Sequence, residues 1–395
     1  QLFKISADGQ ATALTPDTLE MRGLLCQTDE TAYVSGWQDN PLSTHVFKVN
    51  LAAPKPEEGA SLNSPLIEQV SQRDGQNFYA FNGDCSRYLG YHNSVTTPPQ
   101  LRAYETDGEP LAWLNENALN ETHPYAPYME NRITPEFGQI AASDGTKLDY
   151  KIFKPKDMKP GEKRASVTIV YNGPGVQRVS NQWGGNDFAN MLAHHGFVVF
   201  FLDGRGATNR GKAFEDVLYR AMGKAEVIDQ STGADWLKSQ SFIDPDRMGI
   251  YGWSYGGYMS LHMLAQTNQY ASGVAGAPVT DWALYDTAYT ERYLGSPNPK
   301  SENYTAGAYE NNSVFTHLDG LTEPMLLIHG MADDNVVFRH SIKLMDAMQK
   351  RGAHNMRLMT YPGEKHGFRK TENRIHRDRQ ILEFFLDTLD IQEEQ

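Results

Sequence analysis

The chain has 395 residues and a formal net charge of −13 at pH 7. A surface this acidic repels nucleic-acid phosphates and anionic lipids, so we expect no nucleic acid and no anionic membrane surface as a partner. The longest apolar run, Phe197 to Leu202, is too short to span a bilayer. A chain of this length is expected to form two or three domains.

Three local features bear on processing and cofactors. The sequence starts at Gln1 rather than Met, from which we expect that processing or truncation has removed the original start. Cys26 and Cys85 are the only cysteines, and they are consistent either with a disulfide or with two free thiols. No His or Cys spacing matches a metal site, since His194 and His195 are adjacent rather than one helical turn apart. We therefore expect no metal and no other cofactor.

Residues 1–114 consist of short alternating stretches separated by turn residues, a pattern typical of β-strands. Similar segments recur at intervals of roughly 45 to 55 residues, a spacing typical of propeller blades. Asp-Gly pairs, which favour hairpin turns, follow the first and the last of them. The segments are 1–5, 45–49 and 100–104. We expect this region to be the C-terminal part of a β-propeller domain; the alternative is a chance similarity among unrelated hairpins.

Residues 115–395 are expected to form a second domain. A polar connector with a short helix covers 115–132, and a hairpin follows, with strands at 138–142 and 147–153. Beyond it, buried-type strands alternate with helices, which predicts an α/β domain with a largely parallel sheet. The predicted strands are 166–171, 197–202, 248–251, 273–277, 325–329 and 356–361, and the predicted helices include 187–194, 225–238, 340–350 and 372–389. Ligands of such sheets bind beyond the carboxyl ends of the strands.

The stretch Gly252-Trp-Ser-Tyr-Gly256 contains the pattern Gly-X-Ser-X-Gly, with Ser254 at its centre. A short apolar strand precedes it and a helix-like run follows it, which is the context of a nucleophile elbow. The flanking glycines leave room where a strained turn brings backbone segments close together. Without this context, a serine between glycines is usually only part of a loop. The sequence therefore predicts that Ser254 is the nucleophile of an α/β-hydrolase domain.

An acid and a histidine follow Ser254 in the chain order that an α/β-hydrolase requires. Asp333 comes directly after the predicted strand 325–329 and is the expected acid, with Asp334 as the alternative. These aspartates would otherwise be explained as a turn or a helix cap. His366 lies in a loop beside Gly367, after the strand 356–361. All three candidates therefore follow predicted strands, at the sheet edge where a site is expected.

The chemistry of these residue types assigns each a role. A serine hydroxyl is unreactive at its own pKa and needs a base to take its proton. A histidine side chain can act as base and then as acid near neutral pH, which suits His366, while Asp333 would orient its ring. The developing oxyanion needs donors, and the backbone N–H of Tyr255, the residue after the nucleophile, is expected to be one.

Five sequence blocks resemble the prolyl oligopeptidase-type serine peptidases, and in particular the dipeptidyl peptidase IV group. The blocks are Asp203-Gly-Arg-Gly206, Gly252-Trp-Ser-Tyr-Gly-Gly-Tyr258, Tyr289-Thr-Glu-Arg-Tyr293, His329-Gly-Met-Ala-Asp-Asp-Asn-Val336 and Lys365-His-Gly367. The resemblance is dense from residue 165 to 370, whereas the N-terminal third is similar only as propeller-like β-structure. It implies a serine peptidase with an acyl-enzyme mechanism and no cofactor.

The resemblance also implies roles for residues around the triad. Tyr171 falls where the family has a second oxyanion donor, a tyrosine hydroxyl. Asn335 falls where an asparagine binds the carbonyl that precedes the substrate proline. Asp203 and Arg205 are expected to be structural loop residues. The positions that match the walls of the proline pocket are Tyr255, Val279, Trp282, Tyr285, Tyr289 and Val336; ordinary core or sheet packing is the alternative for these aromatic residues.

One departure from the family pattern concerns the substrate amine. Dipeptidyl peptidases bind it with paired glutamates of the propeller, and no matching pair is evident, since Glu57-Glu58 is expected to lie in a solvated loop. We expect cleavage after proline or alanine with release of Xaa-Pro dipeptides. The alternatives are a prolyl tripeptidyl peptidase, an acylaminoacyl peptidase or a broad oligopeptidase. More distant ones are a small-molecule esterase and a non-catalytic interaction protein on the same fold.

The resemblance further implies partners and a compartment. Two blades and a fragment do not close a propeller, which typically has about four to eight blades. We therefore expect association with a missing N-terminal portion, or a homodimer, besides peptide substrates. The dipeptidyl peptidase resemblance favours an exported, periplasmic or extracellular enzyme over a cytoplasmic one.

Overall fold

The computed structural model describes residues 1–52 and 67–390, which fall into two compact units. The first unit comprises Gln1–Thr134, Ser180–Asp187 and Asn209–Gly211. The second comprises Pro135–Val179, Phe188–Thr208 and Lys212–Gln395. The domain boundary that we place between residues 114 and 115 stays a prediction.

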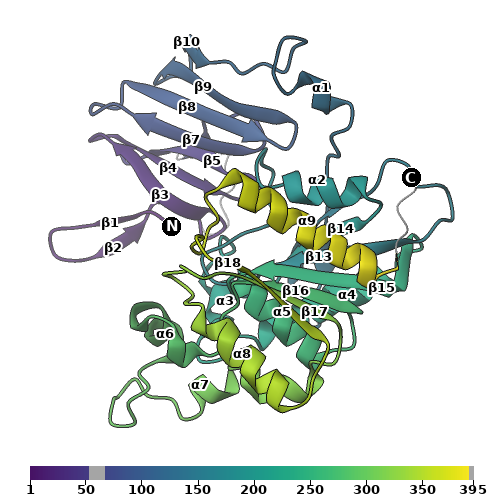
Figure 1. The fold of residues 1–395 in the computed structure, drawn as a ribbon. Coiled ribbons are helices and arrows are strands. Elements are labelled where there is room, and N and C mark those ends of the chain that lie inside the picture. Colours follow the sequence, from purple (N-terminus) through teal and green to yellow (C-terminus); the bar gives the residue numbers. More distant parts are fainter. Residues whose placement is uncertain (53–66, 391–395) are drawn as a thin grey trace. The chain divides into compact units, whose positions relative to one another are not determined.

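The first unit contains two four-stranded antiparallel sheets and one hairpin (Figure 1). In each sheet the strands are hydrogen-bonded in chain order, as in a propeller blade. The first sheet contains β3 (Glu20–Gln27), β4 (Thr31–Trp37), β5 (His45–Asn50) and β6 (Ile67–Gln69). The second contains β7 (Gln76–Phe81), β8 (Arg87–Ser94), β9 (Thr97–Glu105) and β10 (Pro110–Asn115). The hairpin pairs β1 (Phe3–Ile5) with β2 (Ala11–Ala13).

The recurring segments of the sequence occupy equivalent places in these sheets. The segments 45–49 and 100–104 lie in β5 and β9, the third strand of each sheet. The hairpin β1–β2 turns as β9–β10 does: the amides of Ser6 and Glu105 each donate to the carbonyl four residues on, at 2.9 Å. Gly9 and Gly108 hold φ of 86° and 90° in these turns, a conformation that glycine adopts without strain. The hairpin therefore matches the last two strands of a third blade.

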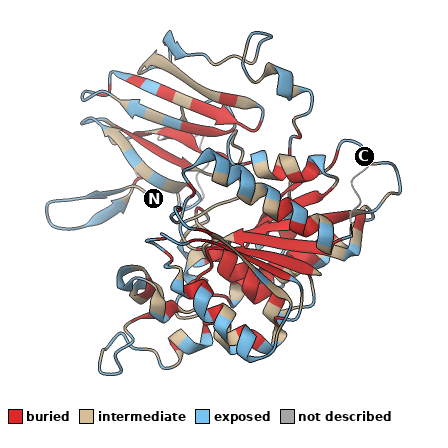
Figure 2. Cartoon of the chain, in the orientation of Figure 1, coloured by how far each residue is buried: buried red, intermediate tan, exposed pale blue. Residues whose placement is uncertain are grey.

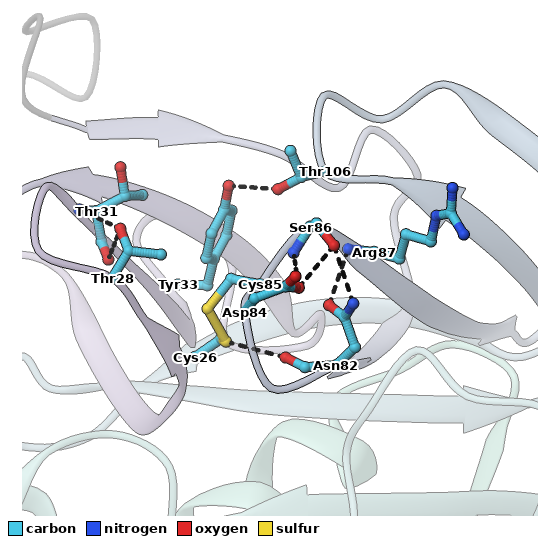
Figure 3. Close-up of a disulfide and its surroundings, with 10 residues drawn as sticks. All are labelled: Cys26, Thr28, Thr31, Tyr33, Asn82, Asp84, Cys85, Ser86, Arg87 and Thr106. Carbon is cyan, nitrogen blue, oxygen red and sulfur yellow. Dashed lines mark hydrogen bonds between the residues drawn. A yellow bond between two sulfur atoms is a disulfide. The ribbon is translucent and has the colours of Figure 1, made fainter.

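A disulfide and an aromatic contact join the two four-stranded sheets. A disulfide links Cys26 of β3 to Cys85 in the turn between β7 and β8, with a Cα–Cα distance of 6.0 Å (Figure 3). Beside it, the rings of Tyr33 and Phe81 lie 4.4 Å apart. The question of whether these cysteines pair, which the sequence leaves open, is thus answered by the packing of the blades.

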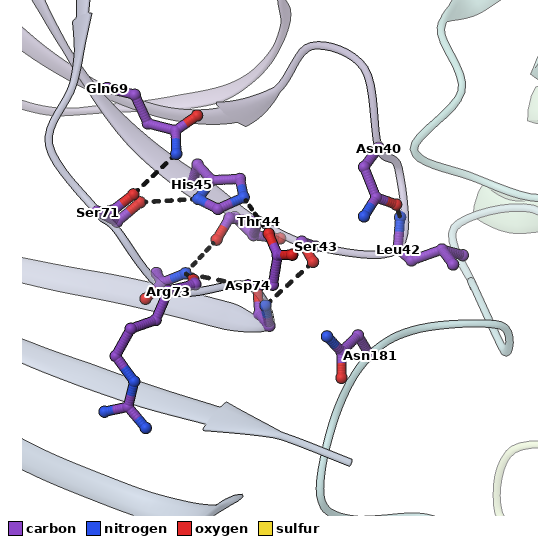
Figure 4. A network of polar contacts seen from close by, with 12 residues as sticks. Asn40, Leu42, Ser43, Thr44, His45, Gln69, Ser71, Arg73, Asp74 and Asn181 are labelled. Carbon is purple, nitrogen blue, oxygen red and sulfur yellow. Dashed lines mark hydrogen bonds and ion pairs between the residues drawn. The ribbon is translucent and has the colours of Figure 1, made fainter. Parts of the chain in front are cut away.

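A buried polar network lies where β5 approaches the start of β7 (Figure 4). The Ser71 hydroxyl accepts from the amide of Val46 and hydrogen-bonds Nδ1 of the buried His45, both at 3.0 Å. The amide of Thr44 donates to the Gly75 carbonyl at 2.9 Å. Burial lowers the pKa of His45, opposed by Asp74. This network satisfies the polar groups that the junction between the blades buries.

A mixed eight-stranded sheet forms the centre of the second unit (Figure 1). Its order is β11-β12-β14-β13-β15-β16-β17-β18; β11 and β12 pair antiparallel, β12 joins β14 antiparallel, and the other pairs are parallel. The strands are β11 (Glu136–Ala141), β12 (Lys147–Phe153), β13 (Arg164–Val170), β14 (Val198–Asp203), β15 (Ile243–Trp253), β16 (Ser272–Gly276), β17 (Met325–Gly330) and β18 (Met356–Tyr361). The predicted hairpin and all six predicted strands are present.

Helices cover both faces of this sheet, α2 and α9 on one face and α4, α5 and α8 on the other (Figure 1). Of the predicted helices, α2 (Asp187–His194) and α4 (Ala225–Lys238) have the predicted bounds. Helix α8 (Arg339–Lys350) begins one residue earlier than predicted, and α9 (Thr371–Thr388) begins and ends one residue earlier. The other helices are α1 (Ala126–Met129), α3 (Lys212–Glu215), α5 (Tyr255–Gln266), α6 (Thr287–Leu294) and α7 (Ala308–Asn311). The predicted fold class, an α/β-hydrolase domain preceded by part of a β-propeller, is confirmed.

The core of the second unit lies between the sheet and its helices. Every residue of β14, β16 and β17 is buried, as Figure 2 shows in red, because both faces of these strands are covered. Phe188 of α2 packs on Tyr251 from one face, and Trp236 of α4 packs on Phe200 from the other. None of the helices in 1–52 and 67–390 combines the length and apolarity needed to cross a membrane.

Candidate active site

Ser254 occupies a sharp turn between β15 and α5. Its backbone has φ 61° and ψ −119°, a strained conformation for a residue with a side chain. Its amide donates to the Gly276 carbonyl at 2.8 Å, and its carbonyl accepts from the Tyr258 amide at 3.0 Å. A Cβ at Gly252 would collide with the Gly256 backbone, so only glycine fits there. The turn has the geometry of a nucleophile elbow.

Asp333, rather than Asp334, contacts His366. Nδ1 of His366 lies 2.8 Å from Oδ2 of Asp333, whose side chain is fully buried. Asp334 is exposed and pairs with Lys365 instead. Burial raises the pKa of Asp333, but hydrogen bonds from His329 and His366 outweigh burial and hold this pKa well below its usual range. A carboxylate that stays charged beside His366 can fix the tautomer of the ring and stabilise its protonated form.

A second histidine, His329, holds the loop that carries Asp333. Its Nε2 lies 2.8 Å from the Val336 carbonyl and 3.2 Å from Oδ2 of Asp333, and its Nδ1 lies 2.8 Å from the Ser341 hydroxyl. All of these groups are buried. This role of His329 was not predicted from the sequence, although its position near the end of strand β17, four residues before Asp333, is a signal that indicates it.

Tyr171 and Tyr255 both line the cavity beside Ser254, and their rings lie 6.1 Å apart. Burial raises the pKa of the Tyr171 phenol, opposed by Arg178 and by the neighbouring Ser254 side chain. A phenol that stays protonated can donate to an oxyanion. Tyr255 opens α5, so its backbone N–H is among the first amides of the helix, which have no intrahelical acceptor.

A cavity of about 320 Å³ adjoins Ser254 and His366. The edge-on contact of Tyr285 with Tyr289, whose centroids are 5.2 Å apart, and the stacking of Trp282 on Tyr289 at 5.9 Å give it aromatic walls. Its remaining lining residues are Tyr171, Trp253, Tyr255, Val279 and Asn335. The size and lining suit a small apolar ring, with few polar groups to fix its orientation.

Two of the residues implied by resemblance differ in their relation to this cavity. Asn335 lines the cavity, and its side-chain oxygen accepts a hydrogen bond from the Tyr285 hydroxyl. The backbone N–H of Asn335 donates to Oδ1 of Asp333 at 2.9 Å. Val336 is fully buried and does not line the cavity; its carbonyl accepts from His329. Val336 thus lies behind the wall of the cavity rather than on it.

Trp253 and Glu364 support the loop of His366, a role that was not predicted for either from the sequence. The indole N–H of Trp253 donates to the His366 carbonyl at 3.0 Å. The buried Glu364 carboxylate accepts from the amides of Arg369 and Lys370 and from the side chain of Asn373. Trp253 could have been noticed as the residue just before the nucleophile.

No group of three His, Cys, Asp or Glu side chains suited to hold a metal ion occurs among the residues that the structure describes. The site brings together a serine, a histidine and a carboxylate beside an aromatic cavity. Such an arrangement can carry out acyl transfer through a covalent serine intermediate.

Comparison with protein families matches residues 185–392, just over half of the chain, to the prolyl oligopeptidase family. The chain belongs to this family. The matched segment contains Ser254, Asp333 and His366, and the resemblance drawn from the sequence blocks is confirmed.

Known relatives cover nearly the whole chain. It is 32% identical over 389 residues to human dipeptidyl peptidase 8, an alignment of 94% of this chain and 41% of the relative. The mouse dipeptidyl peptidase 8 is 32% identical over 370 residues, with 90% and 39% covered. The crystal structure of Porphyromonas gingivalis dipeptidyl peptidase 4 superposes with a TM-score of 0.85 at 25% identity, covering 98% of this chain and 55% of that one. The chain thus spans about two fifths of the length of these curated relatives.

Proposed function

We propose that the protein containing this chain is a serine peptidase that releases Xaa-Pro dipeptides from the N-terminus of peptides. The observation that carries this proposal is the aromatic cavity of about 320 Å³ lined by both Ser254 and His366. The dipeptidyl peptidase relatives support the reaction class.

In the proposed mechanism, the hydroxyl oxygen of Ser254 attacks the carbonyl carbon of the scissile bond while His366 takes the hydroxyl proton. Asp333 holds the ring of His366 and stabilises its charge, which its 2.8 Å contact supports. The oxyanion accepts from the Tyr171 hydroxyl and from the Tyr255 amide. His366 then gives the proton to the leaving amine as the peptide bond breaks. In the second half of the reaction, His366 takes a proton from a water molecule as its oxygen attacks the acyl carbon, and returns that proton to Ser254 as the ester bond breaks.

Proline is the proposed residue on the acyl side of the cleaved bond. Its ring is short and rigid, so the walls formed by Trp282, Tyr285 and Tyr289 can cover it without depth for longer side chains. Proline also has φ already restricted, so less conformational freedom is lost on binding. Alanine fits the same space but leaves part of it unfilled, which is why we propose it as a weaker substrate residue.

The proposed exopeptidase specificity depends on a group that binds the substrate amine. Glu57 and Glu58, two adjacent glutamates of the N-terminal region, lie outside the described residues. Tripeptidyl release, acylaminoacyl release and internal cleavage therefore remain the alternatives. Comparing anilides of Gly-Pro, Ala-Ala-Pro, N-acetyl-Gly-Pro and N-acetyl-Ala separates these four specificities, because an acylaminoacyl peptidase frees the aniline only from the last of them.

The test of the reaction class uses a fluorophosphonate probe and two substrates. We expect the probe to label Ser254 and Ser254→Ala to remove nearly all hydrolysis of Gly-Pro anilide, because members of a triad act as a unit. Hydrolysis of a simple butyrate ester should be much slower than that of the anilide. Labelling at another serine would refute the site, and a preference for the ester would favour a small-molecule esterase.

We also propose that the protein is exported and that it forms a homodimer. The disulfide between Cys26 and Cys85 supports export, because such bonds persist in oxidising compartments. Cell fractionation tests the compartment, and light scattering of the intact protein tests the homodimer. Recovery in the cytoplasm with free thiols would contradict the first proposal, and a monomeric mass the second.

A further inference from the structure

Helix α4 turns three polar side chains toward the core, on the face where apolar residues are expected. Glu226, Asp229 and Gln230 are each no more than 1% exposed. Their spacing of three and four residues places them on one side of the first turns of the helix. The same side continues with buried Ala234 and Leu237. Buried polar groups of this kind need partners, and the partners here lead to the proposed active site.

Glu226 contacts the residue that follows the nucleophile. The Tyr255 hydroxyl donates to Oε1 of Glu226 at 2.6 Å, and the Gly223 amide donates to the same oxygen at 2.8 Å. Oε2 of Glu226 is buried and has no hydrogen-bond partner. The ring of Tyr255 lies 6.1 Å from that of Tyr171 and 5.9 Å from that of Trp282, between the cavity and Glu226. Glu226 thus anchors Tyr255 from the side away from substrate.

Gln230 and Asp229 contact the loops next to the other oxyanion donor. The side-chain amide of Gln230 donates to Oδ1 of Asn172 at 3.2 Å and to the Leu202 carbonyl at 3.0 Å. Asn172 directly follows Tyr171 and has φ 53°. Its side chain also donates to the Arg205 carbonyl at 3.1 Å and accepts from the Gly204 amide.

Asp229 fixes the loop on which this network depends. Its carboxylate accepts from the amide of Arg205 at 2.7 Å and from the guanidinium at 2.6 to 3.2 Å. The loop that contains Gly204 and Arg205 is therefore tied to α4, and Asn172 is tied to that loop. The strained residue after Tyr171 is held from two directions, as a rigid placement of the phenol requires.

We propose that Glu226, Asp229 and Gln230 of α4 position the two oxyanion donors, the Tyr255 amide through the Tyr255 side chain and the Tyr171 hydroxyl through Asn172. This inference rests on the proposed peptidase function and names positioning residues for it. None of the three touches substrate. They act by keeping the donors in place before the oxyanion forms, which is the source of the stabilisation that such donors give.

The chemistry of Glu226 favours positioning over simple packing. A leucine of similar size would fill the space without burying a carboxylate, whose desolvation destabilises the fold. Yet the carboxylate uses one oxygen for two donors and leaves the other without a partner. A group that only filled the core would not need this arrangement.

The test separates binding of the oxyanion from binding of the ground state. For wild type, Tyr255→Phe, Glu226→Leu and Gln230→Leu, we would measure kcat and KM for Gly-Pro anilide and the inhibition constants of a Gly-Pro boronic acid analogue and of a product dipeptide. The boronate forms a tetrahedral adduct on serine and needs the oxyanion donors, whereas the dipeptide does not. Ile228→Ala, on the exposed face of α4, is the matched control.

We expect each variant to lower kcat and boronate affinity together, by about 10- to 100-fold, because a small misplacement of a catalytic group costs on this scale. KM and dipeptide affinity should change less than about threefold, and Ile228→Ala should behave as wild type. Glu226→Gln retains an acceptor oxygen and should restore most of kcat. The double variant Tyr255→Phe, Glu226→Leu should lose little more kcat than Glu226→Leu alone, because each change removes the same hydrogen bond between the two side chains.

Equal weakening of the boronate and the dipeptide, or unchanged kcat in folded variants, would overturn the inference. Melting temperatures identify variants that fail to fold, and Tyr255→Phe and Glu226→Gln alter the fewest atoms. Should the wild type not cleave Gly-Pro anilide, the proposed function would fail on its own. The rate at which the fluorophosphonate labels Ser254 would then still measure the oxyanion site in each variant.

Discussion

Asp333 is the residue at which the structure gives the sharpest prediction. It contacts His366, while its neighbour Asp334 is exposed and pairs with Lys365. Asp333→Asn should lower kcat by about 10⁴, the scale seen when the acid of a serine triad loses its charge and the histidine its tautomer. Asp334→Asn is the matched control and should have little effect. Steady-state kinetics with Gly-Pro anilide measures both; the reverse order would show that the wrong carboxylate was chosen.

Helix α4 is the element whose buried acid should make stability depend on pH. Burial raises the pKa of Glu226 to about 7, against hydrogen bonds from Tyr255 and Gly223, while its ordinary value is 4.5. Asp229, also buried, contributes to raising it. Between these two pH values the folded state holds a proton that the unfolded state has lost. The stability from Glu226 is therefore complete below pH 4.5 and is lost as pH rises through 7.

This loss should be about 3 kcal/mol, from about 1.4 kcal/mol for each unit of difference in pKa. Urea unfolding of wild type and Glu226→Gln at several pH values between 4.5 and 8 measures it. The wild type should lose stability relative to the variant as pH rises, because glutamine cannot ionise. Any pH dependence from Asp203, whose pKa burial raises to about 6, cancels in the comparison. Parallel profiles would show that Glu226 does not titrate in this range.

The segment from Val279 to Tyr289 is the element that should set the selectivity of the cavity. Tyr285→Ala removes one aromatic wall and its hydrogen bond to Asn335. It should lower kcat/KM for proline substrates and reduce the preference for proline over alanine, which we expect to be about 1 to 3 kcal/mol in the wild type. Gly-Pro, Gly-Ala and Gly-Leu anilides measure this. Efficient cleavage after leucine by the wild type would exclude a proline pocket.

At the scale of the whole molecule, the disulfide should stabilise the blades rather than the hydrolase unit. It closes a loop across a sequence separation of 59 between two sheets of the first unit. Chain-entropy arguments give about 4 kcal/mol for a loop of this length. The double change Cys26→Ser and Cys85→Ser should lower the unfolding transition of the first unit and leave that of the second in place. Calorimetry measures this; equal shifts in both transitions would show that the units unfold together.

Much of the second unit could be predicted because its signals are local. Strands such as β14 are buried on both faces and are therefore mostly apolar. Helices such as α4, with 14 residues, are longer than typical strands and contain residues that favour helices. The triad residues follow from the same pattern. In a parallel sheet the carboxyl ends of strands converge, so residues just after β15, β17 and β18 come together although they are far apart in sequence.

The fold class, the order of the strands along the chain, and Ser254, Asp333 and His366 as triad candidates could all be predicted from the sequence, with Asp334 left as the alternative acid. The pairing of Cys26 with Cys85, the contact of Asp333 rather than Asp334 with His366, and the place of Val336 behind the cavity wall came only from the packed structure. It also revealed the polar face of α4. Each of these depends on the direction of a side chain relative to elements distant in the sequence. Packing of those elements fixes that direction, and local residue patterns carry no record of it.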